Sequence, residues 1–185
     1  MNDTIIIFTD RAERFSHLLA QVDGRWDAPT PCTDWTVRDL VRHVIDTERG
    51  FLEQHQLPVP AAAPDADPEQ EWRAHAGAVI DLISRDGVAE RHFDGYFGPT
   101  TIGDTMANFY GWDLAAHCWD LARAIGQDDP ISDAEARELS AVADGWGPAL
   151  YSAGVCAPAR PIDDDASDVD KLLAKLGRDP EWTAA

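Results

Sequence analysis

Residues 104–126 read DTMANFYGWDLAAHCWDLARAIG, and this stretch decides what kind of protein the chain forms. With residues placed about 100° apart, as in an α-helix of 3.6 residues per turn, its large apolar side chains share one broad face. These are Met106, Phe109, Tyr110, Leu114, Leu121 and Ile125. Gly126 is typical of the position just beyond a helix C-terminus. The pattern predicts one long helix over 104–125 that packs into a core.

The same face also carries polar groups. Asp113, His117 and Asp120 fall among its apolar side chains. An unpaired carboxylate is costly to bury, so a cation, a basic side chain or solvent in a cavity has to neutralise Asp113 and Asp120. Asp113 and His117 are four residues apart and can reach one point above the helix. Carboxylate oxygen and imidazole nitrogen are ordinary zinc ligands, so a metal ion is one interpretation. A hydrogen-bonded Asp–His pair in a wet core is the other.

Helical periodicity continues on both sides of this stretch. We expect further helices over about 5–22, 37–55 and 69–84, one that follows Ser132, and a short one over 168–176. Residues 58–68 are expected to form an exposed linker rich in Pro, Ala and Asp. Four main helices with one long crossover are typical of a helix bundle. Residues 86–102 are rich in glycine and aromatic residues, and we expect an irregular segment there, or a short extended piece within it, as a candidate pocket wall. The chain is predicted to be one domain, 1–185, with a C-terminal extension of about 130–185 packed on the bundle.

Composition excludes several partners. The chain has 34 acidic and 15 basic residues and a formal net charge of −19, which argues against nucleic acid and against anionic membrane surfaces. No apolar run approaches the roughly 20 residues of a membrane span. The three cysteines are odd in number and show no CxxC spacing, so a disulfide framework does not fit. We therefore expect a cytoplasmic protein.

A third metal ligand has to come from another helix. His43 lies at the flank of the apolar face of 37–55, which suits the rim of a bundle cavity and equally an ordinary half-exposed histidine. Glu48 lies at the centre of that face. It is a candidate hydrogen-bond partner of a ligand histidine, a candidate general base, or a candidate ion-pair partner of an arginine.

Two tryptophans and a cysteine have simpler interpretations. Trp112 and Trp119 point away from the face of Asp113, toward either the far side of the core or a homodimer interface, where aromatic residues are enriched. Cys32 lies in a Pro-rich loop, and we interpret it as a small packing residue.

Three separated blocks resemble one family. Residues 26–43, WDAPTPCTDWTVRDLVRH, resemble the entry to the second helix of DinB-like metal-binding proteins, in the branch that contains the N-terminal domain of mycothiol-dependent maleylpyruvate isomerase. Residues 113–126 resemble the second motif of that branch, and residues 172–180, LLAKLGRDP, resemble the ending of its small stand-alone members. The resemblance implies an all-α, DinB-like up-down-down-up four-helix bundle with extra C-terminal helices.

The resemblance also implies a site for a divalent metal, usually taken as zinc, with Ni²⁺ as another candidate. Three residues would hold the metal: His43, Asp113 and His117. The isomerase has Glu where this chain has Asp113, which is one methylene shorter. Three residues would surround the ligands: Asp120 or Glu48 would orient a ligand histidine, and Tyr110 would line the pocket. No catalytic residue is assigned.

The chemistry implied by the family uses a low-molecular-weight thiol such as mycothiol. Three protein ligands leave an open metal position, and a thiol bound there is deprotonated. We therefore expect a zinc-dependent thiol transferase or isomerase-like enzyme whose partners are a small-molecule thiol and an electrophile. The alternatives are a metal- or ligand-binding protein without catalysis, a metal-dependent hydrolase, and a purely structural bundle.

Overall fold

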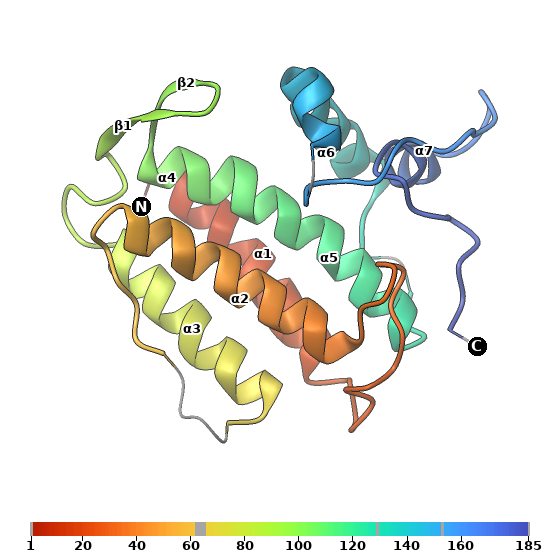
Figure 1. Cartoon of the computed structure of the whole chain (residues 1–185), viewed down its shortest axis with the longest axis horizontal. Coiled ribbons are helices and arrows are strands. Elements are labelled where there is room, and N and C mark those ends of the chain that lie inside the picture. Colours follow the sequence, from red (N-terminus) through yellow and green to blue (C-terminus); the bar gives the residue numbers. More distant parts are fainter. Residues whose placement is uncertain (1, 62–65, 129, 153, 185) are drawn as a thin grey trace.

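The computed structural model describes residues 2–61, 66–128, 130–152 and 154–184. Four long helices form a bundle: α1 (Asp3–Leu19), α2 (Val37–Gln54), α3 (Pro68–Ile83) and α5 (Gly111–Ala124). Helices α1 and α5 run in one direction and α2 and α3 in the other (Figure 1). Helix α1 packs against α3 and α5, and α2 packs against the same two helices. This all-α, up-down-down-up arrangement confirms the predicted fold class. Residues 62–65 of the predicted linker lie outside the described residues.

Local capping explains where the helices begin. The Thr36 side chain accepts a hydrogen bond from the backbone N–H of Asp39, whose carboxylate accepts one from the Thr36 backbone, so α2 starts with a full capping box. Pro68 is the first residue of α3 and directly follows the capping residue Asp67. Side-chain caps of this kind satisfy N–H groups that have no partner inside the helix.

The prediction of one continuous α-helix over 104–125 is wrong in one respect, because a π-helical turn interrupts the α-helix. A short α4 (Ile102–Thr105) leads into a π-helix (Met106–Tyr110), and α5 follows. Arg11 of α1 donates from Nη1 to the carbonyl oxygen of Ala107 at 2.9 Å, which satisfies an acceptor in the wider turn. Gly111 leaves room for this approach, since a Cβ there would lie 3.2 Å from the Arg11 Nη1. The π turn changes the phase of the helix. Phe109, predicted on the core face, is therefore 37% exposed.

Residues 86–102 contain a regular hairpin, so of the two expectations the extended piece is the one that the structure has. Strand β1 (His92–Gly95) pairs antiparallel with β2 (Gly98–Thr101), with Gly95 opposite Gly98. Gly98 has a φ of +110°, a conformation that L side chains rarely adopt. The hairpin stands beyond one end of the bundle (Figure 1). Tyr96 and Phe97, between its two strands, are exposed.

The C-terminal elements cover the outer side of α5. Helix α6 (Asp133–Trp146), a 3-10 turn (Gly147–Tyr151) and α7 (Asp168–Lys175) form this layer (Figure 1). Trp112 and Trp119 are buried in a second apolar cluster together with residues of α6 and α7, and Trp112 Nε1 donates to the Leu139 carbonyl at 2.9 Å. The interpretation of these tryptophans as a dimer interface is therefore wrong, because the chain itself covers them.

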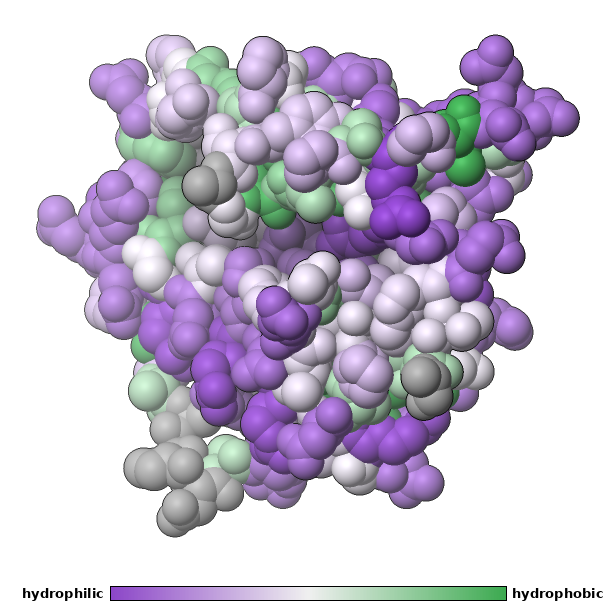
Figure 2. Space-filling model, turned by 45° about the vertical axis from the view of Figure 1, so that its right-hand side comes forward, coloured by the Kyte–Doolittle hydropathy of each residue, from purple (hydrophilic) through white to green (hydrophobic). Residues whose placement is uncertain are grey.

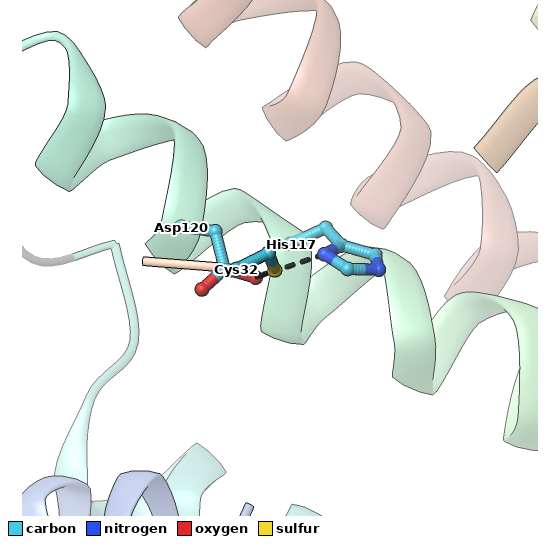
Figure 3. Close-up of side chains that lie close together, drawn as sticks. All are labelled: Cys32, His117 and Asp120. Atoms are coloured by element: carbon cyan, nitrogen blue, oxygen red, sulfur yellow. Dashed lines mark hydrogen bonds and ion pairs between the residues drawn. The ribbon is translucent and has the colours of Figure 1, made fainter. Parts of the chain in front are cut away.

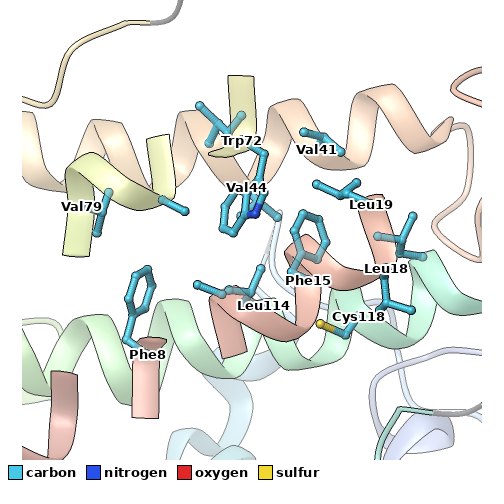
Figure 4. Packing of buried hydrophobic residues seen from close by; sticks show 14 of the residues in the cluster. Phe8, Phe15, Leu18, Leu19, Val41, Val44, Trp72, Val79, Leu114 and Cys118 are labelled. Carbon is cyan, nitrogen blue, oxygen red and sulfur yellow. The ribbon is translucent and has the colours of Figure 1, made fainter. Parts of the chain in front are cut away.

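The main core lies inside the bundle. Phe8, Phe15, Trp72 and Leu114 pack there, and the rings of Phe15 and Trp72 meet edge to face at 4.8 Å (Figure 4). Cys118 is buried in the same cluster, and burial raises the pKa of its thiol to about 12. In the part of the chain that the structure describes, no helix has both the length and the apolar character of a membrane span.

Candidate metal centre

Three donor groups from two helices meet at the wall of a cavity. His43 comes from α2, and Asp113 and His117 lie one turn apart on α5. The His117 Nε2 lies 3.5 Å from Asp113 Oδ1, and the His43 Nε2 lies 3.7 Å from Asp113 Oδ2. The three donor atoms all lie within 4.8 Å of one another. The structure thus brings together the three residues that the resemblance implied as metal ligands.

The spacing of these donors is compatible with a shared metal ion. Both carboxylate–imidazole separations exceed the usual length of a hydrogen bond to nitrogen, about 2.7–3.2 Å. Two ligands at about 2.0–2.1 Å from a tetrahedral zinc ion lie about 3.4 Å apart. The observed 3.5 Å from His117 to Oδ1 of Asp113 and 3.7 Å from His43 to Oδ2 of the same carboxylate are close to that separation. Two imidazole nitrogens and one carboxylate oxygen are also a suitable donor set for zinc.

A buried ion pair orients His117. Its Nδ1 donates to Asp120 Oδ2 at 2.8 Å, which leaves Nε2 directed toward Asp113. Arg178 donates to both Asp120 oxygens, from Nε at 2.8 Å and from Nη2 at 2.6 Å. Gly177 brings Arg178 into place at a φ of +77°, where a Cβ would lie 2.6 Å from the Cβ of Ala157. A basic side chain thus neutralises Asp120.

The electrostatics of the site favour positive charge at the His117 ring. Burial by itself lowers the pKa of His117, but the charge of Asp113 and the hydrogen bond to Asp120 raise it well above its ordinary value. Burial raises the pKa of Asp120, and the stronger effect of Arg178 and His117 holds it well below its usual range. The pKa of Asp113 is lowered by His117 and His43 against the opposing effect of burial. A site with this potential attracts a proton or a metal cation.

Cys32, His117 and Asp120 form a second group of potential ligands, shown in Figure 3. The Cys32 thiol donates to Asp120 Oδ2 at 3.3 Å, and Arg178 Nη2 lies 3.9 Å from its sulfur. A cation here would compete with Arg178 for the same carboxylate. This group is therefore better explained as the hydrogen-bonded support of His117. The interpretation of Cys32 as a packing residue missed this role.

The cavity beside these groups has a volume of about 430 Å³. The Trp35 ring packs on His43 at 4.6 Å and on His117 at 6.0 Å between centroids. Residues 151–152, 154–157 and 176–178 contribute to its lining, so the C-terminal layer completes the pocket. Asp113 is 30% exposed, which makes the site accessible. Figure 2 shows a face that is hollowed near its middle and largely covered by hydrophilic residues.

Two of the predicted surrounding residues lie elsewhere. Glu48 is buried and its Oε2 lies 2.9 Å from His75 Nε2, so its partner is His75 rather than His43 or His117. Tyr110 lines a different cavity, although Glu48 and Asp113 add to the effect of burial in raising its pKa. Among the predicted surrounding residues, Asp120 is the one that contacts a histidine of the candidate site, His117.

Sequence reasoning did not identify Arg178 and Cys32. Each lies in a block that resembles the family, 172–180 or 26–43, and this was the available signal. Both are distant in sequence from Asp120, so helical spacing on 104–125 gave no indication of the contact.

Comparison with known proteins agrees with this architecture. Residues 8–122 match the family model described as the mycothiol maleylpyruvate isomerase N-terminal domain. Two relatives from different strains of Mycobacterium tuberculosis, the uncharacterized proteins MT0763 and Rv0738, are each 28% identical over 182 residues, covering 95% of this chain and 98% of the relative. No solved structure matches the chain. The chain belongs to the family of the mycothiol maleylpyruvate isomerase N-terminal domain.

Proposed function

We propose that this protein binds a divalent metal, zinc in the first place, through His43, Asp113 and His117, and that it transfers a low-molecular-weight thiol such as mycothiol to an electrophile. The observation that carries the proposal is the convergence of three donor atoms within 4.8 Å of one another at an accessible cavity. Membership of a family named for a mycothiol-dependent enzyme supports the thiol as co-substrate.

A bound metal with an open coordination position would lower the pKa of a thiol bound at that position. The residues of the chain then have separate tasks. Asp120 and Arg178 hold the His117 ring, Trp35 packs against His43, and Asp113 faces the cavity. In the transfer, the S–H bond breaks and its proton leaves to solvent while the sulfur forms a bond to an electrophilic carbon. In an addition, the π bond of the electrophile opens and its other atom takes up a proton; in a substitution, a leaving group departs with the electron pair of its bond to carbon. An isomerase-like reaction would later break that S–C bond and release the thiol.

Metal content tests the ligand set. We expect near-stoichiometric zinc in the purified wild-type protein and its loss in the double variant His43→Ala, His117→Ala, measured by mass spectrometry of the metal. The matched control is His17→Ala, because His17 is an exposed histidine on α1. Zinc retained by the double variant at the wild-type level would show that the site is elsewhere.

Thiol dependence tests the reaction. We expect a product that carries a new S–C bond, formed only when mycothiol, an electrophile and metal-loaded protein are all present. Turnover without added thiol would instead support the alternative of a metal-dependent hydrolase. Stoichiometric metal binding without turnover across a panel of electrophiles would support a binding protein without catalysis.

A further inference from the structure

A second cavity, of about 540 Å³, lies at the hairpin end of the bundle and shares no lining residue with the candidate metal site. The hairpin, the end of α2, the π-helix and Trp146 of α6 form its walls. The inference drawn from this cavity is independent of the proposed function.

Aromatic rings dominate these walls. The rings of His55 and Phe93 lie 4.2 Å apart, and those of Phe51 and Tyr110 lie 5.1 Å apart. Trp146 adds an indole from the C-terminal layer. Ring faces carry the negative part of the aromatic quadrupole, so a cluster of rings around one cavity attracts cations.

The charged groups of the lining have the same sign. Asp94 and Asp104 contribute carboxylates, and no lysine or arginine lines the cavity among the described residues. Asp94 takes part in none of the ion pairs found among the described residues. Asp104 accepts a hydrogen bond from the Thr101 hydroxyl at 2.8 Å. Arg91 lies near His55 without lining the cavity. Burial and Arg91 lower the pKa of His55, so this imidazole adds no positive charge at neutral pH.

The π-helix provides an independent observation at the same place. It spans Met106–Tyr110, and its residues Asn108, Phe109 and Tyr110 line the cavity. Single π turns are uncommon and occur frequently at functional sites. Here the turn is stabilised from outside the cavity by Arg11, as described above.

We propose that this cavity binds a small organic cation, an ammonium group carried on an apolar and preferably aromatic body. The aromatic faces would contact the ammonium group and the apolar body, and the two carboxylates would attract the charge. The net charge of −19 adds a long-range attraction for cations.

Three probes of nearly the same shape test the charge preference by isothermal titration calorimetry. They are choline, its neutral carbon analogue 3,3-dimethyl-1-butanol, and the anion 3,3-dimethylbutanoate. The titrations use metal-free protein with a chelator present, because the carboxylate and hydroxyl groups of these probes could otherwise ligate zinc at the candidate metal site. We expect choline to bind at least about fivefold more tightly than the alcohol and the carboxylate to bind most weakly. Benzyltrimethylammonium should bind more tightly than choline, because it also buries an aromatic ring.

Variants locate the binding. Phe93→Leu removes a ring from the wall, and Tyr96→Leu removes one that is 86% exposed and so leaves the fold intact. Asp94→Asn removes a carboxylate, with Asp81→Asn on α3, outside the cavity, as its matched control. We expect weaker choline binding in the first three variants and unchanged binding in the control.

Several results would overturn this inference. They are equal affinity for choline and the neutral alcohol, tighter binding of the carboxylate, and no binding of benzyltrimethylammonium at millimolar concentration. Choline affinity that is unchanged in both Tyr96→Leu and Asp94→Asn would also overturn it.

Discussion

The substitution Asp120→Asn tests the chain of contacts that holds His117. It keeps the size of the side chain and removes its charge. The Asp120 side chain is fully buried and that of Arg178 is 11% exposed, so the remaining guanidinium would have little solvent to replace its partner. The amide would also be a weaker acceptor for the His117 Nδ1–H than the carboxylate is.

The expected loss of stability is large. Removal of one partner of a buried ion pair costs about 3–5 kcal/mol, because an uncompensated charge stays behind. This is a substantial part of the roughly 5–15 kcal/mol by which a typical domain is stable. For a chain of this length it corresponds to a decrease in Tm of roughly 6–20 °C. Zinc affinity should fall by about 10–100-fold, because His117 loses the group that orients it.

Thermal unfolding followed by circular dichroism measures the first effect, with a chelator present so that lost metal does not contribute. Competition with a chromophoric chelator measures zinc affinity. The matched control is Glu69→Gln, which breaks the exposed pair with Arg73 on α3 and should cost less than about 1 kcal/mol. Adding Arg178→Met to Asp120→Asn should recover part of the lost stability, because the unpaired charge is then gone. A Tm for Asp120→Asn equal to that of the control would refute the reasoning.

Two further predictions concern buried groups. Glu48 and His75 are buried as a pair, and burial raises the pKa of Glu48 despite the opposing effect of His75. In thermal denaturation experiments, either single variant, Glu48→Met or His75→Phe, should lower Tm, because it leaves the other polar group buried without its partner. The double variant should recover most of this loss. A double variant less stable than both single ones would contradict this. Iodoacetamide at pH 8 should modify half-buried Cys32 and leave Cys118, whose pKa burial raises to about 12, unmodified until the protein unfolds, as peptide mass spectrometry can show. Rapid labelling of Cys118 in the native protein would be the contrary result.

Much of the architecture follows from the sequence alone. The apolar periodicity of 37–55 and 69–84 agrees closely with α2 and α3, because a helix is set by residues three or four positions apart. The capping residue Thr36 is likewise recognisable from its neighbours. Asp113 and His117 share one face of α5 by their spacing, so the candidate site was visible as a local pair.

Tertiary structure decided the rest. The π turn is stabilised by Arg11, which belongs to another helix, so a wheel drawn on 104–125 could not predict the exposure of Phe109. The partner of Asp120 is Arg178, 58 residues further along the chain, and the partner of Glu48 is His75. A buried carboxylate requires neutralisation wherever it lies, so the sequence implied that partners exist. Which groups supply them depends on how distant segments pack, and local periodicity carries no information about that packing.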